Sequence, residues 1–167
     1  MIRAGIIGGA GYTAGELVRL LLNHDSTELA FVHSSSNAGN PLTAVHAGLF
    51  GETEMRFASD YDLSSIDVLF ICSAHGESRR FIESTELPPH MKIIDLAQDF
   101  RDESDGFVYG LPELNRKRIA GAGRVANPGC FATAIQLALL PLAAEGLIDD
   151  EIHITAITGS TGAGVKP

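Results

Sequence analysis

Apolar and polar positions divide the chain into short apolar runs, glycine-containing turns and segments with helical spacing. The clearest apolar runs have the length of strands buried on both faces, and they are residues 4–7, 29–32, 68–72 and 93–96. Between the first two runs, residues 17–22 place leucine and valine side chains on one face of a helix. Strands that alternate with helices predict an α/β protein, so we expect a doubly wound, mostly parallel sheet.

The first apolar run ends in a glycine turn, and a helical segment begins directly after it. In such a strand–turn–helix unit, the glycines let the backbone approach a pyrophosphate and the helix N-terminus supplies N–H donors. The turn therefore predicts a Rossmann-like dinucleotide-binding unit, with a plain structural turn as the alternative. The cofactor-binding residues predicted here are Gly8, Gly11, Tyr12, Thr13 and Ala14.

The segment after the second predicted strand indicates which dinucleotide binds. An NAD enzyme usually places Asp or Glu about 20 residues after the glycines, where the carboxylate contacts the ribose. This chain has hydroxyls there instead, at Ser34, Ser35 and Ser36. Hydroxyls without a carboxylate suit a 2′-phosphate, so the sequence favours NADP(H) over NAD. A polar loop without a ligand is the alternative, since no arginine stands nearby in the sequence.

A second turn, Asn127–Gly129, leads from a short apolar run into another helical segment. Proline fixes φ and glycine accepts a positive φ, so this triplet predicts a tight turn that places Cys130 at the start of the helix. Unpaired N–H groups and the helix dipole stabilise a thiolate there, which makes Cys130 a candidate nucleophile. A buried, inert cysteine is the alternative. Cys72 falls within an apolar run and is expected to be such a buried thiol.

Charge and cysteine content narrow the classes of function. A formal net charge of −9 argues against nucleic-acid and membrane partners, because both attract clustered Lys and Arg. The longest apolar stretch, residues 134–144, is too short to span a bilayer. The two cysteines lie far apart, which argues against disulfides and favours a reducing, cytoplasmic location. We expect no metal site.

Six short motifs occur in a fixed order along the whole chain. They are Gly8–Leu17, Ala74–Gly76, Asp95–Arg101, Tyr109–Leu114, Asn127–Thr133 and the glycine-rich residues 159–164. Together they resemble the N-acetyl-gamma-glutamyl-phosphate reductases, NADPH-dependent enzymes of arginine biosynthesis. The resemblance implies an NADP-binding Rossmann domain over residues 1–150 and the start of an α+β substrate domain over residues 151–167. Chains of that family run to about twice this length. We therefore expect most of the second domain to be absent here and its catalytic histidine to lie outside this chain.

The resemblance also implies a reaction and the residues that perform it. Cys130 is expected to form a thioester with an acyl-phosphate substrate, Gly162 to contact the cofactor, and the full-length enzyme to be a homo-oligomer. Arg101 and Asn127 are expected to bind the substrate, since a guanidinium group matches a phosphate or a carboxylate. For Arg101, an ion pair with a nearby Asp95 or Asp99 is the alternative.

Two other functions remain open from the sequence. An aspartate-semialdehyde dehydrogenase uses the same cysteine chemistry on a shorter substrate, although the Asp99–Arg101 and Tyr109–Glu113 motifs favour the glutamyl enzyme. A nucleotide-binding module without catalysis is the second alternative. Cys130 in its strand–turn–helix setting argues against such a module, and its thiol reactivity distinguishes the two.

Overall fold

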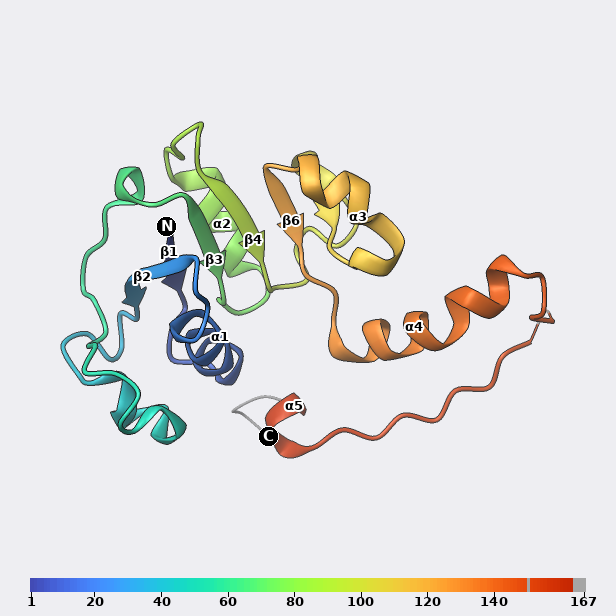
Figure 1. Cartoon of the computed structure of the whole chain (residues 1–167), viewed down its shortest axis with the longest axis horizontal. Helices are drawn as coiled ribbons and strands as arrows, with labels where there is room; N and C mark the ends of the chain where they lie inside the picture. The colour runs from blue at the N-terminus through green and yellow to red at the C-terminus, as the bar shows by residue number, and fades with distance from the viewer. Residues whose placement is uncertain (150, 164–167) are drawn as a thin grey trace.

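Six parallel strands form one sheet in the order β2-β1-β3-β4-β6-β5 (Figure 1). This arrangement comes from a computed structural model that describes residues 1–149 and 151–163. Every strand pairing is parallel, which confirms the predicted sheet. The strands are β1 (Ile2–Ile7), β2 (Thr27–His33), β3 (Val68–Ile71), β4 (Lys92–Asp95), β5 (Val108–Tyr109) and β6 (Arg124–Ala126).

Helices and short 3₁₀ turns connect the strands. The α-helices are α1 (Tyr12–Leu22), α2 (Glu77–Ser84), α3 (Pro112–Gly121), α4 (Cys130–Ala144) and α5 (Ser160–Ala163). The 3₁₀ turns are η1 (Leu42–Ala44), η2 (Ala47–Leu49), η3 (Leu63–Ser65) and η4 (Ser104–Gly106). The glycine turn and the Asn127–Gly129 turn both lead from a strand into a helix, as the sequence predicts.

Apolar side chains cover both faces of the sheet. Val18 of α1 packs with Ile6 of β1 on one face. Phe81 of α2 packs on the other face, against the cluster that contains Leu69 and Ile71 of β3. Successive side chains of a strand point to opposite faces, so helices on both sides explain why the central strands read as continuous apolar runs. The doubly wound architecture is therefore confirmed.

The strand order places a switch point beside β1. The chain passes from β1 to β2 on one side, and β3 then adds to the other side of β1. In open α/β sheets, ligands bind in the crevice outside the carboxyl ends of the strands at such a point. The loops that follow β1, β2 and β3 are therefore the first place to look for a ligand site.

The last part of the chain leaves the sheet. Figure 1 shows α4, in orange, extending away from the strands, and the red segment after it turning back to α5 without joining the sheet. No residue of α4 is buried, and the alternating run 152–157 forms no strand within the described part of the chain. Ile152, Ile154 and Ile157 are exposed. None of the described helices is long and apolar enough to cross a membrane.

Candidate active site

A cavity of about 280 Å³ lies at the carboxyl ends of β1 and β3. It occupies the switch point at which a doubly wound sheet is expected to bind a ligand. The loop after β2 closes one side of it. The wall residues are Ile7, Gly8, Ala10, His33, Ser34, Ser35, Ser36, Cys72, Ser73, Ala74 and Glu77.

The cavity brings together residues that are far apart in the sequence. Gly8 and the serines at 34–36 were predicted to share a site, and all four line this cavity. Ala10, His33 and the residues after β3 were missed as cofactor candidates. The signal that could have found them is topological, since the carboxyl ends of parallel strands meet at one edge of the sheet.

The glycine turn packs directly against the end of β3. Gly8 has a positive φ of 78°, and a Cβ there would lie 2.6 Å from the carbonyl carbon of Cys72. No other residue fits this position without moving the backbone of the neighbouring strand. The N–H of Gly9 donates to the His33 carbonyl over 2.9 Å, which ties the turn to β2. Three strand ends are therefore held around the cavity.

Gly11 is a glycine for a different reason. Its φ is −77°, and a Cβ there would meet only the Gly8 oxygen, at 3.9 Å. Neither the backbone nor the packing requires glycine, so space is available for a ligand at this point. Directly beyond it, the N–H groups of Tyr12, Thr13 and Ala14 find no acceptor among the described residues. An open glycine beside free donors at a helix N-terminus fits a dinucleotide pyrophosphate.

The loop after β2 carries the predicted hydroxyls. Ser34 is buried and its Oγ lies 3.4 Å from Oγ of Ser36, while the amide of Asn37 donates to the Ser36 hydroxyl over 3.0 Å. His33 has a buried Nδ1 without a hydrogen-bond partner in the described part of the chain. An orphaned buried nitrogen in the cavity wall is consistent with a missing ligand group, because buried polar atoms are normally paired.

Cys130 is the first residue of α4 and an exposed free thiol. The Asn127 N–H donates to the Asp95 carbonyl over 2.7 Å, which fixes the start of the turn on β4. The turn itself differs from the prediction, because Gly129 has a φ of −68° and uses no positive φ. Glycine leaves room there for the Arg101 guanidinium, since a Cβ would lie 3.1 Å from Nη1 of Arg101.

Arg101 holds the Asn127–Gly129 turn by hydrogen bonds to backbone carbonyl oxygens. Its Nε donates to the Asn127 carbonyl over 2.9 Å, and Nη2 donates to the Leu96 carbonyl over 3.1 Å. Among the described residues it forms no ion pair with Asp95 or Asp99, so that alternative is wrong for this structure. Its Nη1 lies against Gly129 with no hydrogen-bond partner in the described residues and remains available to an anion.

Both acids instead bind the segment after β3, Asp99 contacting the loop and Asp95 the start of α2. The Asp99 carboxylate accepts from the Gly76 N–H at 2.8 and 3.0 Å. Asp95 is fully buried and accepts from the Ser78 hydroxyl over 2.6 Å. Burial raises the pKa of Asp95, and burial together with the charge of Asp95 raises the pKa of Cys72 to about 12. Cys72 is therefore a neutral thiol at physiological pH.

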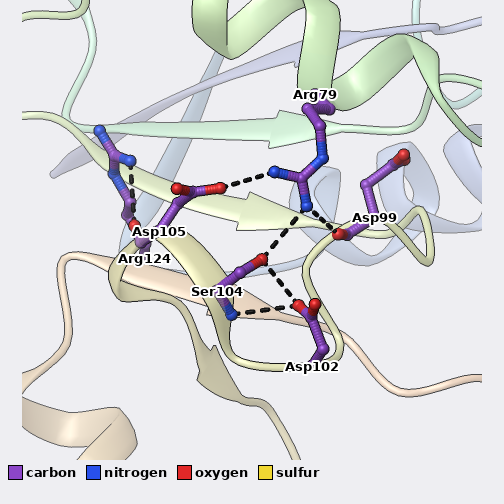
Figure 2. Close-up of polar contacts among 6 residues, drawn as sticks. All are labelled: Arg79, Asp99, Asp102, Ser104, Asp105 and Arg124. Carbon is purple, nitrogen blue, oxygen red and sulfur yellow. Dashed lines mark hydrogen bonds and ion pairs between the residues drawn. The ribbon is translucent and has the colours of Figure 1, made fainter.

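A second arginine fixes the segment that carries Arg101 (Figure 2). Arg79 of α2 donates to the Asp99 carbonyl over 2.6 Å and to the Ser104 hydroxyl over 3.2 Å. Its guanidinium also pairs with the Asp105 carboxylate at 2.7 Å, and it lies 4.5 Å from the centroid of the Phe100 ring. Asp105 has a positive φ of 54°, which is uncommon for a non-glycine residue. These contacts hold the whole segment against α2.

Of the predicted site residues, only Gly8 and the serines at 34–36 line the cavity. Gly11 and residues 12–14 lie beside it at the start of α1, and Arg101 and Cys130 lie at the turn after β6. Gly162 lies on α5, is exposed and does not line the cavity wall, so its cofactor contact stays a prediction. Asn127 is exposed beside Cys130, and its amide donates to the Pro128 carbonyl over 3.1 Å. No group of His, Cys, Asp and Glu side chains suited to a metal ion occurs within the described residues.

Comparison with known proteins gives two family matches. The model described as the semialdehyde dehydrogenase NAD binding domain matches residues 3–122, and that of the semialdehyde dehydrogenase dimerisation domain matches residues 130–167. Two similar curated proteins, from Parabacteroides distasonis and Bacteroides thetaiotaomicron, are named N-acetyl-gamma-glutamyl-phosphate reductase. They are 61% and 62% identical over the whole of this chain and 52% of their own length. The chain spans about half the length of the curated relatives it matches.

Solved structures share the fold at much lower identity. Aspartate semialdehyde dehydrogenase with NADP from Candida albicans has a TM-score of 0.66 at 15% identity, over 89% of this chain and 48% of that one. The Francisella tularensis aspartate semialdehyde dehydrogenase has a TM-score of 0.67 at 21% identity, over 87% and 42%. Since the first family model covers most of the chain and these structures share its fold, the chain belongs to the semialdehyde dehydrogenase family, and residues 3–122 form its NAD-binding domain.

Proposed function

We propose that this chain belongs to an enzyme that reduces N-acetyl-gamma-glutamyl phosphate with NADPH, giving N-acetylglutamate semialdehyde and phosphate. The observation that carries the proposal is an exposed thiol, Cys130, directly after the glycine against which the Arg101 guanidinium lies, on the sheet edge that also holds the cavity. The two curated reductases at 61% and 62% identity support the choice of substrate.

Cys130 is the proposed nucleophile. Its thiolate attacks the acyl carbon, the bond from that carbon to the phosphate oxygen breaks, and phosphate leaves with the electron pair. The N–H groups at the start of α4 can hold the oxyanion that develops during this attack. Bound NADPH would supply the hydride that reduces the resulting thioester. Collapse of the reduced adduct then releases the aldehyde and regenerates the Cys130 thiolate.

Arg101 is the proposed phosphate-binding residue. Two of its nitrogens are already used by the Asn127 and Leu96 carbonyls, and Nη1 faces the turn that precedes Cys130. An anion bound to Nη1 would therefore sit next to the thiol, where the leaving phosphate has to be. Asn127 is the second proposed substrate contact, because it is exposed on the same turn.

The cavity at the switch point is the proposed NADPH site. Gly8 and Gly11 would admit the pyrophosphate, and the N–H groups of residues 12–14 would bind it. The serines at 34–36 would receive the 2′-phosphate, since no carboxylate stands among them to repel it. The side chain of Ala14 is buried, so only its backbone can take part.

An aspartate-semialdehyde dehydrogenase is the second candidate, because the solved structures reported above carry that name. The decisive experiment uses the complete gene product and follows NADPH oxidation with N-acetyl-gamma-glutamyl phosphate or with aspartyl phosphate. We expect turnover with the glutamyl substrate and its loss in Cys130→Ser. Turnover only with aspartyl phosphate would select the second candidate, and NADPH binding without turnover of either would select a non-catalytic module.

The cofactor site can be tested separately. Gly11→Ala should leave folding intact, because the nearest atom to the new methyl group is 3.9 Å away. The same methyl group should weaken NADPH binding by at least about tenfold, because it fills the space of the pyrophosphate. Gly121→Ala is the matched control, since a Cβ there meets nothing within 4 Å and Gly121 lies at the end of α3. Unchanged NADPH affinity in Gly11→Ala would contradict the site.

We also propose a homo-oligomer in the cytoplasm. The exposed apolar side chains Phe131, Leu137 and Leu142 of α4 support self-association, as does the dimerisation-domain model that matches this part of the chain. Both cysteines are free thiols, which supports a reducing compartment. Sedimentation of the complete gene product tests the first proposal, and localisation of a tagged protein tests the second.

A further inference from the structure

His46 contacts the glycine turn from a distant part of the chain. It immediately precedes η2, and its Nε2 lies 2.7 Å from the carbonyl oxygen of Gly9. A carbonyl oxygen can only accept, so Nε2 carries a proton and donates. The contact joins the segment between β2 and β3 to the turn after β1, across 37 residues of sequence.

The imidazole ring occupies a place built for it. A Cβ on Gly15 of α1 would lie 2.5 Å from the ring Nδ1, so glycine at this helical position leaves room for the ring. On another side, the ring packs against Phe57, with 6.0 Å between the ring centroids. Glycine inside a helix is unfavourable relative to alanine. Its presence at position 15 is explained by the room that the His46 ring needs. The ring is therefore held in position while its Nε2 reaches Gly9.

The hydrogen bond fixes the direction of a neighbouring N–H group. In a trans peptide, the carbonyl of one residue and the N–H of the next point in opposite directions. Because the Gly9 carbonyl points to His46, the Ala10 N–H points away from His46. Ala10 lines the cavity, and its N–H has no acceptor within the described residues. The Gly9 N–H is already donated to the His33 carbonyl, so it is not available, whereas Ala10 supplies a free donor at the cavity.

We propose that His46 is a positioning residue for the cofactor: it orients the Gly9–Ala10 peptide so that the Ala10 N–H donates to the pyrophosphate of the bound dinucleotide. The inference rests on the proposed NADPH site and deepens it. It assigns a role to the segment between β2 and β3, which otherwise contributes only the serine loop to the cavity.

The test compares two substitutions and two ligands on the full chain. His46→Phe keeps a ring and loses the donor, whereas His46→Gln keeps a donor at a similar reach. NADPH carries a pyrophosphate, and adenosine 2′-monophosphate does not. We expect His46→Phe to weaken NADPH binding by about tenfold, the effect of one charge-assisted hydrogen bond. Its affinity for adenosine 2′-monophosphate should stay at the wild-type value, and His46→Gln should restore most of the NADPH affinity.

A purely structural role for His46 would give a different pattern. Equal losses for both ligands, or no rescue by His46→Gln, would overturn the inference, and so would wild-type NADPH affinity in His46→Phe. If His46→Phe does not fold, Gly15→Ala displaces the ring from the other side and should give the same selective loss. A wild-type chain that binds no NADPH would overturn both the cofactor site and this inference. If the wild-type chain binds NADPH but the His46 variants do not show the expected affinities, only the role of His46 is overturned.

Discussion

The two thiols of the chain should differ strongly in reactivity, and the structure gives a magnitude for the difference. The pKa of Cys72 rises from 9.0 to about 12, because the partly buried thiol is desolvated and lies near the charge of Asp95. At neutral pH, three pKa units reduce its thiolate fraction by about a thousandfold. A thiolate of higher pKa is more nucleophilic, which raises the rate constant of the Cys72 thiolate by a factor of about 15–30. The net effect is a rate about 30- to 60-fold below that of an ordinary thiol.

Cys130 has no such disadvantage. It is exposed at the first turn of α4, one residue after the glycine that lies against the Arg101 guanidinium. An exposed sulfur is open to the alkylating reagent. We therefore expect limiting iodoacetamide near pH 7 to modify Cys130 at least about 30-fold faster than Cys72.

Peptide mapping by mass spectrometry after timed alkylation gives both rates in one experiment. Cys72→Ala and Cys130→Ala are matched controls, because each leaves a single thiol whose rate should equal its rate in the wild-type chain. Labelling of Cys72 first, or equal rates at the two positions, would refute the reasoning. Such a result would mean either that burial does not protect Cys72 or that the reagent does not reach Cys130.

Three further predictions follow from the same edge of the sheet. Parallel titrations should show tighter binding of NADPH than of NADH, because residues 34–36 offer hydroxyls and no carboxylate; equal affinities would contradict this. Arg101→Met should lower the free energy of unfolding in urea by roughly 2 kcal/mol and slow alkylation of Cys130, whereas Arg101→Lys should preserve much of the alkylation rate because it keeps the charge. The wild-type free energy of unfolding should fall as pH rises from about 9 to about 12, by up to about 1.4 kcal/mol per pH unit, because the folded chain holds the Cys72 proton more tightly than the unfolded chain. Cys72→Ala should remove this part of the pH dependence, and an unchanged slope would show that other groups cause it.

The sequence was sufficient for elements whose signal is local. Apolar runs marked the central strands, and the glycine turn and the Cys130 turn each joined a strand to a helix where predicted. Residues 37–60, which include His46, have no clear periodicity in the sequence and therefore predict no element. Gly9, the partner of His46, is 37 residues away, and no local pattern encodes a contact at that separation.

The role of Arg101 was hidden for a related reason. From sequence proximity, Asp95 and Asp99 were the natural partners of its charge. In the fold, β6 lies between β4 and β5, which brings the Asn127 carbonyl within reach of Arg101. The order of strands in a sheet is set by long-range packing, so neither this hydrogen bond nor the negative φ of Gly129 follows from the sequence alone.

The strand order also sets how far a cofactor has to reach. The cavity lies over β1 and β3, whereas Cys130 follows β6, with β4 between the two positions. Neighbouring strands are about 4.8 Å apart, so roughly 10–12 Å of sheet edge separate the cavity from the line of β6. In the proposed NADPH site, the second nucleoside is therefore the part of the dinucleotide that has to cross β4 to reach Cys130.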